Sequence, residues 1–476
     1  ARVSRGEFES VREIFNWARE KDKTDRIEIL GFVDYNRSAD WIREAGGSVV
    51  NLLTKGSRKH CEQQLGKNLS EHLRDIEKTI GYARSTGLEV HVYLEDWSNG
   101  MLSSPDYVME LLTGLMNFEI RRFLLPDTLG ILAPHEVSAF ITDITRAFPD
   151  RHFDFHGHND YGLATANCLA AVQAGASGLH VAVNGLGERA GNSPLETVVT
   201  ALHDKLGVKT GVNEKAIMDA SRLVETFSGK RIASNRPIVG QDVYTQTAGI
   251  HADGDKKNNL YANPISPERF GRERVYALGK LSGKASLSQN LKALGIELSK
   301  EREAQLLQRI IELGEQKNLV TRDDLPFLML DLFGSAQQTG TIQIVDAEIR
   351  TSLQERPQAE LTIGYEGQTF RAQASGDGGY NAFMNALALI LPRIGQECAE
   401  LIDYEVRIPP GGQTDALVET VITWRYSNES KTFRTVGVDP DQIRAAIKAT
   451  ERMLNHRIAL QTVERDVLGA SLRPFA

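Results

Sequence analysis

Residues 121–160 read RRFLLPDTLGILAPHEVSAFITDITRAFPDRHFDFHGHND, and their pattern decides the fold. Two short apolar runs flank one amphipathic stretch, which predicts a strand at Arg122–Pro126, a helix at His135–Phe148 and a strand at His152–His158. A strand, a helix and another strand at this spacing form a βαβ unit, in which the two strands are parallel.

The same alternation of strand and helix runs through about the first 200 residues. Further strands are predicted at Ile27–Val33, Val49–Thr54, Glu89–Glu95 and Gly178–Val183. An open doubly wound sheet is one alternative, but no GxGxxG follows the opening strand. Polar residues gather at the C-terminal strand ends, as in a TIM (β/α)8 barrel. Because such a barrel needs eight strands, we expect two of them to precede Ala1, which is not a Met.

The sequence predicts three domains: an N-terminally incomplete catalytic barrel at residues 1–228, linker subdomains at 229–336 and a regulatory domain at 337–476. The linker subdomains begin with a Gly/Asn/Pro-rich stretch of little periodicity. A helical block follows, with predicted helices at 285–294, 300–316 and 322–332.

The regulatory domain contains an internal duplication. Each half is predicted to be a βββα unit, and both third strands contain Thr-Phe-Arg, at Thr369 and Thr432. The predicted strands are 341–345, 359–365 and 368–374 in the first half and 403–408, 416–425 and 431–436 in the second; the helices are 381–391 and 440–454. We expect a ligand pocket between the halves, near Asp377–Tyr380 and Pro409–Gly412.

Composition excludes several classes of protein. The chain has 476 residues, of which 41% are hydrophobic and 25% charged, as in ordinary globular proteins. A net charge of −8 and a pI near 5.9 give the chain no general electrostatic attraction to nucleic acid or to anionic membranes. Three widely separated cysteines without CxxC spacing indicate a reducing, cytoplasmic setting.

The strongest local signal is the pair His156 and His158. Side chains alternate along a strand, so both imidazoles point the same way, about 7 Å apart. At the C-terminal end of a strand they form a metal chelate, unless they are simply buried, hydrogen-bonded histidines. Asn192, at the end of the next Gly-rich loop, offers a further oxygen, unless that loop is a plain strand–helix turn that needs glycine. No carboxylate is evident, and we expect it on the missing first strand.

Strand parity predicts which other residues share this site. Glu95 lies beside aromatic residues, where burial would raise its pKa towards general-acid use; the alternative is a solvated carboxylate. Thr128 either donates a hydrogen bond to a substrate carboxylate or caps the following helix. Leu30, Leu53 and Tyr93 point inward too. Beside a metal, Leu30 and Leu53 would form an apolar wall; otherwise they are barrel packing.

Four motifs together resemble the isopropylmalate, homocitrate and citramalate synthase family. They are Pro126–Thr128 (PDT), His156–Asp160 (HGHND), Gly187–Asn192 (GERAGN) and Gly249–Gly254 (GIHADG). The duplicated C-terminal end resembles that family's amino-acid-binding domain, so the resemblance covers the whole chain. It implies a Claisen-type condensation of acetyl-CoA with a 2-oxo acid on a divalent metal, which is Zn, Mn, Co or Mg.

The resemblance also implies roles for individual residues. His156 and His158 would be metal ligands with Asn192 in or beside the coordination shell, and Thr128 would hold the substrate carboxylate. Glu95 and His251 would be the acid/base pair, with Tyr261 helping, and His251 would come from the partner subunit of a homodimer. The family's Arg-Asp pair on the first strand has no match here.

The substrate and the effector are less tightly indicated. The sequences of residues 93–100, 277–284 and 403–412 most resemble those of pyruvate-using citramalate synthases, for which isoleucine is the expected inhibitor. Leu30, Leu53 and Tyr93 would crowd the isopropyl group of 2-oxoisovalerate, the substrate of 2-isopropylmalate synthases. For those enzymes leucine is the expected inhibitor. Further alternatives are an acyl-CoA lyase and a non-catalytic amino-acid sensor.

Overall fold

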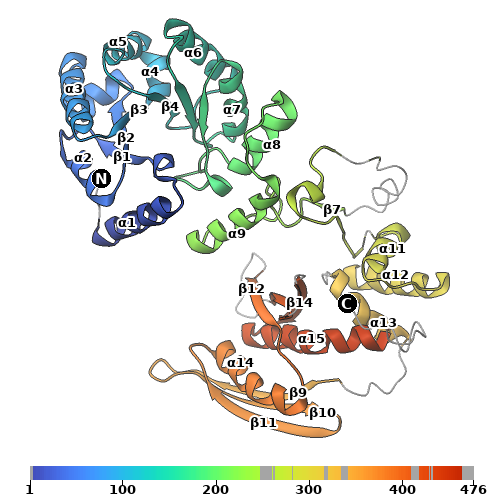
Figure 1. Cartoon of the computed structure of the whole chain (residues 1–476). Helices are drawn as coiled ribbons and strands as arrows, with labels where there is room; N and C mark the ends of the chain where they lie inside the picture. Colours follow the sequence, from blue (N-terminus) through green and yellow to red (C-terminus); the bar gives the residue numbers. More distant parts are fainter. Residues whose placement is uncertain are drawn as a thin grey trace. The chain divides into compact units, whose positions relative to one another are not determined.

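The computed structural model describes residues 4–246, 260, 263–280, 282–315, 320–333, 341–408, 417–427, 429 and 432–463. These residues form two compact units (Figure 1). Unit 1 consists of residues 1–243 and 263–273, and unit 2 of residues 244–262 and 274–476. No helix in the described ranges is long and apolar enough to cross a membrane.

Unit 1 is built on a six-stranded parallel sheet whose strands follow one another in chain order. The strands are β1 (Ile29–Phe32), β2 (Val49–Lys55), β3 (Glu89–Glu95), β4 (Arg122–Asp127), β5 (Phe153–Gly157) and β6 (Gly178–His180). A doubly wound sheet reverses its strand order at a switch point, whereas a (β/α) barrel keeps it consecutive. The α/β barrel prediction is therefore confirmed for these six strands.

Helices connect the strands and cover them (Figure 1). They are α1 (Arg5–Glu20), α2 (Arg37–Ala45), α3 (Leu69–Ser85), α4 (Trp97–Ser103), α5 (Pro105–Leu115), α6 (Pro134–Ala147), α7 (Ala164–Gln173), α8 (Leu195–Leu206) and α9 (Ile217–Ser228). The start of α3 is set by a capping box between Asn68 and Glu71. Its apolar face packs Ile76 into one continuous core with Val92 and Phe123 of the sheet.

Unit 2 begins with a small parallel sheet and a helical subdomain. Strands β7 (Thr245–Gln246) and β8 (Val275–Tyr276) pair within the stretch for which the sequence showed little periodicity. Helices α11 (Lys284–Ala293), α12 (Lys300–Glu315) and α13 (Leu325–Phe333) then surround a core that includes Leu287 and Ile310. The predicted helical block is confirmed, with every helix end within three residues of its predicted position.

The predicted duplication is confirmed as two three-stranded antiparallel sheets, each followed by a helix. The first half is β9 (Gln343–Arg350), β10 (Gln358–Tyr365), β11 (Gln368–Ser375) and α14 (Gly379–Ile390). The second half is β12 (Glu400–Arg407), β13 (Val418–Arg425), β14 (Thr432–Asp439) and α15 (Gln442–Thr462).

Helix α15 is longer than predicted, and it ends at Thr462 rather than at residue 454. The reason is tertiary packing. Its middle section packs Ala449 and Met453 into the core shared by the two repeats. Its last turn leads Ala459 and Val463 into the core of the helical subdomain.

Candidate active site

His156 and His158 lie at the C-terminal end of β5, with ring centroids 5.1 Å apart. The predicted common direction of the two side chains is therefore confirmed. The ring of Tyr93, from β3, lies 5.7 Å from the ring of His156. The strand register explains this arrangement, because Tyr93 pairs with Leu124 of β4, and Pro126, two residues further on, pairs with His156.

A third histidine, His180 of β6, pairs in register with His156, and their rings lie 5.8 Å apart. Its Nε2 faces the buried carboxylate of Asp154 at 3.7 Å. The sequence analysis missed His180. The available signal was its position near the end of a strand next to the one that carries His156.

The loop after β6 brings Asn192 to the histidines. Residues His158 and Asn192 form an isolated backbone bridge, and the amide of Asn159 donates to the carbonyl oxygen of Gly191 at 2.9 Å. The Asn192 Nδ2 donates to the carbonyl oxygen of Leu186, also at 2.9 Å. This hydrogen bond fixes the orientation of the side-chain amide of Asn192, and with it the position of Oδ1.

Three buried polar atoms at this place have no hydrogen-bond partner among the described residues: Nδ1 of His156, Nδ1 of His158 and Oδ1 of Asn192. Burial lowers the pKa of His156 to about 3 and also lowers the pKa of His158. Neutral imidazoles and an amide oxygen are metal donors, so these residues fit a divalent ion. Within the described ranges no cluster of three or more His, Cys, Asp or Glu completes such a site.

Glu95 ends β3 on the face that carries Tyr93 and His156, and it forms an ion pair with Lys55. Lys55 ends β2 and pairs in register with Glu95. The sequence analysis did not consider Lys55. A lysine rarely lies buried without an ionic partner, and here Glu95 is that partner.

Thr128 does not cap a helix, because α6 begins at Pro134 with Ala133 in the N-cap position. Instead, its Oγ1 accepts a hydrogen bond of 2.9 Å from the backbone amide of Asp96. Asp96 itself is in the left-handed region, with φ of 65°. Its buried carboxylate accepts a hydrogen bond of 2.6 Å from Ser57. The loops after β2, β3 and β4 are thus joined.

Arg189 extends this connection to the loops after β5 and β6. Its guanidinium donates to both carboxylate oxygens of Asp160, at 2.8 and 2.9 Å, and to the carbonyl oxygen of Thr128 at 2.8 Å. These contacts lower the pKa of Asp160. The Gly187–Asn192 motif therefore connects three loops through one side chain.

Leu30 and Leu53 lie on the same face of the sheet as Tyr93, as strand parity predicted. Leu53 pairs in register with Tyr93, and Leu30 pairs with Asn51, two residues before Leu53. Leu53 is half-buried and Leu30 is 44% exposed.

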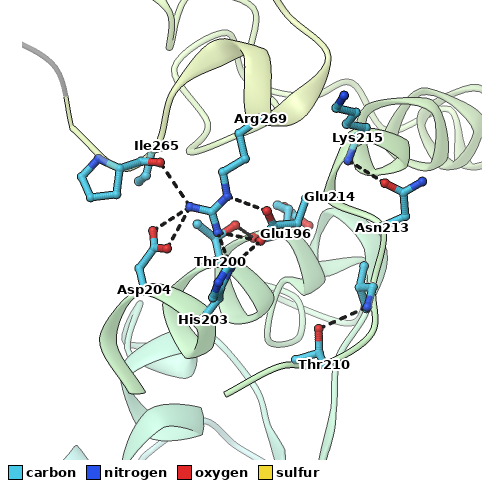
Figure 2. Close-up of polar contacts among 12 residues, drawn as sticks. Glu196, Thr200, His203, Asp204, Thr210, Asn213, Glu214, Lys215, Ile265 and Arg269 are labelled. Atoms are coloured by element: carbon cyan, nitrogen blue, oxygen red, sulfur yellow. Dashed lines mark hydrogen bonds and ion pairs between the residues drawn. The ribbon is translucent and has the colours of Figure 1, made fainter. Parts of the chain in front are cut away.

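His251 and Tyr261 lie outside the described residues, but the chain on either side of them is anchored in unit 1. Arg236 forms an ion pair of 3.0 Å with the buried carboxylate of Glu196. Figure 2 shows the second anchor, Arg269, whose guanidinium reaches Asp204 at 2.8 Å and Glu214 at 2.6 Å. Arg236 and Arg269 thus tie the described residues on either side of this segment to other residues of unit 1.

The expected effector pocket is described only in part, since residues 409–412 lie outside the described ranges. On its other side, the ring of Tyr380 lies 5.3 Å from the ring of Tyr404. The hydroxyl group of Tyr380 is hydrogen-bonded to Thr450 at 2.7 Å. Asp377 pairs with Arg356 at 2.6 Å.

Comparison with known proteins identifies three family regions along the chain. Residues 1–224 match the family described as HMGL-like, residues 238–318 the homocitrate synthase post-HMGL domain and residues 319–458 the LeuA allosteric (dimerisation) domain.

Relatives carry two different activity names. The chain is 32% identical to the (R)-citramalate synthase CimA of Methanocaldococcus jannaschii, over 85% of this chain and 81% of that protein. It is 29% identical to the 2-isopropylmalate synthase of the same organism, over 96% of this chain and 86% of that protein. A protein of Methanopyrus kandleri named "Probable 2-isopropylmalate synthase" is 32% identical, over 95% and 89% of the two chains.

Proposed function

The chain belongs to the family of (R)-citramalate and 2-isopropylmalate synthases, and on that premise we propose that it condenses acetyl-CoA with pyruvate to give (R)-citramalate and CoA. The observation that carries the proposal is the grouping of His156, His158 and Tyr93 at the C-terminal strand ends. At this place Nδ1 of both imidazoles and Oδ1 of Asn192 have no hydrogen-bond partner among the described residues.

The 2-oxo acid would be held at this grouping. A divalent metal on His156, His158 and Asn192 would supply Lewis-acid polarisation of the substrate carbonyl group. The Thr128 hydroxyl accepts the Asp96 amide hydrogen, so its own hydrogen is oriented towards another acceptor. We assign that hydrogen to the substrate carboxylate.

Proton transfer would use Glu95, with His251 and Tyr261 as the other acid/base groups. The methyl C–H bond of acetyl-CoA breaks, the proton passes to a base, and the electron pair forms the new bond to the carbonyl carbon of the 2-oxo acid. The π pair of that carbonyl group moves to its oxygen, which takes up a proton from an acid group to give the hydroxyl group of the product. Water then cleaves the thioester and releases CoA, which makes the sequence effectively irreversible.

The choice of pyruvate rests on the size of the apolar side chains. Leu30, Leu53 and Tyr93 share one face of the sheet, and beside the proposed metal they would leave room for a methyl group and would crowd an isopropyl group. Each methylene group in an apolar pocket changes binding by about 1–3 kcal/mol, so selectivity would be strong but not absolute. The second candidate is 2-isopropylmalate synthesis from 2-oxoisovalerate, which the names of the relatives support equally.

The C-terminal region would make the protein a homodimer under feedback control. This proposal rests on the match to the LeuA allosteric (dimerisation) domain. We propose the division into barrel (1–228), linker subdomains (229–336) and regulatory domain (337–476), with isoleucine as effector near Tyr380; leucine is the alternative effector.

The test is CoA thiol release in the presence of a divalent metal. Pyruvate and 2-oxoisovalerate are compared, each with and without isoleucine and leucine. Faster turnover with pyruvate, inhibited by isoleucine, supports citramalate synthesis. Preference for 2-oxoisovalerate would support 2-isopropylmalate synthesis, the second candidate. Absence of thiol release with both acids would contradict the proposed function.

A further inference from the structure

Lys55 occupies an unusual place for a lysine. Its side chain is only 10% exposed, at the C-terminal end of β2, and its ammonium group contacts Oε2 of Glu95, whose side chain is 26% exposed. The strand register sets this contact, because Lys55 and Glu95 are paired residues of neighbouring parallel strands. Both side chains lie on the face that carries Tyr93.

The backbone of Lys55 is held from two helices. Its amide donates to Nε2 of His72, from α3, at 3.1 Å, and its carbonyl oxygen accepts from the hydroxyl group of Tyr107, from α5, at 3.1 Å. Burial lowers the pKa of His72 to about 4, so the ring is an uncharged acceptor. The next amide, of Gly56, donates to the carbonyl oxygen of Glu95 at 2.6 Å. Lys55 is therefore fixed in place and does not extend to solvent.

A lysine in this position has one evident effect on Glu95. The ammonium group of Lys55 contacts Oε2 of Glu95, and an ion pair between two partly buried side chains restricts the positions that each can take. The Glu95 carboxylate is therefore held in one place, at the C-terminal end of β3.

We propose that Lys55 is a positioning residue for the condensation, acting through Glu95. The inference rests on the proposed function. Through the ion pair, Lys55 holds the carboxylate of Glu95 directed at the methyl group of the acetyl thioester. In that step the methyl C–H bond breaks, the proton passes to Glu95, and the electron pair of that bond forms the enolate. Lys55 neither gains nor loses a proton.

A double-mutant cycle tests this assignment. The variants are Lys55→Met, which removes the charge at similar volume, Glu95→Gln, and the two combined. Lys55→Arg serves as the conservative variant. The matched control is Lys67→Met, since Lys67, just before α3, is 43% exposed and pairs with Asp75 of that helix at 2.5 Å. Thermal unfolding checks each fold, and Lys55→Gln replaces Lys55→Met if that variant does not fold.

The expected result is a kcat about 100-fold lower in Lys55→Met, the scale of one general acid–base contribution, with little change in the KM of either substrate. Lys55→Arg should recover most of that loss, and Lys67→Met should match the unchanged protein. In the Glu95→Gln background, Lys55→Met should cause no further loss, because the group through which it acts is already gone.

Two results would overturn the inference while leaving the proposed function intact. One is an unchanged kcat in Lys55→Met. The other is an equal loss in both backgrounds, which would mean that Lys55 acts independently of Glu95, as a purely structural group would. If the unchanged protein releases no CoA with either 2-oxo acid, the proposed function and this inference fail together.

Discussion

At the scale of single residues, it is the grouping of three unpartnered atoms, on His156, His158 and Asn192, that favours a ligand set over ordinary buried histidines. Buried polar atoms in proteins nearly always find a partner. His180 is different, since it faces the carboxylate of Asp154 although its ring is close to that of His156. Proximity to His156 is therefore not sufficient to assign His180 as a ligand.

This difference predicts unequal effects on metal binding. His156→Gln should abolish measurable divalent-metal binding, because it would remove one of the proposed ligands. His180→Gln should cost at most the roughly 10–100-fold that loss of an outer partner costs. Isothermal titration with Zn²⁺ and Mn²⁺, together with metal analysis of the purified variants, gives both values. Equal losses in the two variants would assign His180 to the ligand set.

A second residue-scale prediction concerns pH. The pKa of His72 is lowered to about 4 in the folded protein, whereas an unfolded histidine has a value near 6.5. Below pH 6.5 the unfolded chain therefore binds a proton that the folded chain does not, and stability falls as the pH falls towards 4. Between pH 7 and pH 5 this single group should cost about 2 kcal/mol.

Urea unfolding at pH 7 and pH 5 measures that loss. In His72→Gln, which retains an acceptor for the Lys55 amide but does not titrate, the difference between the two pH values should shrink by about the same 2 kcal/mol. An unchanged difference would show that other groups cause the pH dependence.

The predictability of the site also differs from residue to residue. His156 and His158 were identified from two positions in one strand, so local alternation was enough. Lys55 and Glu95 are 40 positions apart and meet only through the register of β2 with β3. Likewise, the partner of Thr128 is the backbone of Asp96, which adopts a left-handed conformation that nothing in the local sequence specifies.

At the scale of elements, the loop after β2 is seated directly on the end of β3. A Cβ atom on Gly56 would come within 2.5 Å of the carbonyl oxygen of Leu94 and 3.0 Å of that of Glu95. Backbone atoms cannot move aside as a flexible side chain can. Gly56→Ala should therefore displace Glu95 and lower kcat.

Gly81, in the exposed middle of α3, provides the matched control, because nothing lies within 4 Å of an added Cβ there. Gly81→Ala should leave kcat unchanged and stabilise the protein by about 0.5–1 kcal/mol, since alanine favours the helix. Thermal unfolding and CoA release on both variants test the pair. Normal kinetics in Gly56→Ala would mean that the loop relaxes without moving Glu95.

The barrel strands and the repeat duplication were predictable because apolar runs and their spacing are local features. The length of α15 was not, because its last turn is stabilised by residues from another subdomain. Ala459 and Val463 contact the core formed by α11, α12 and α13, more than a hundred positions earlier in the chain. The small β7–β8 sheet was missed for a different reason, because each of its strands is only two residues long and shows no periodicity.

At the scale of the whole molecule, α15 connects two cores of unit 2. Its middle belongs to the core of the repeats and its end to the core of the helical subdomain. Polar contacts run in parallel, because Arg452 of α15 pairs with Asp324 at 3.2 Å and the amide of Arg434 donates to Asp323 at 2.9 Å. A change in the repeats is therefore expected to reach the helical subdomain through α15.

Gly437 of β14 allows a direct test of this connection. A Cβ atom there would collide with the backbone of α15 at Ala445 and Ala449, so Gly437→Ala should shift the helix and cost about 1–3 kcal/mol. If α15 couples the cores, amide hydrogen exchange should quicken in α14 and in α11 and α12 alike, but not in α3 of unit 1. Gly364→Ala is the control, because its methyl group meets only the side chain of Val345, at 3.3 Å. Faster exchange confined to the repeats would show that α15 does not transmit the change, and feedback control would then need another route.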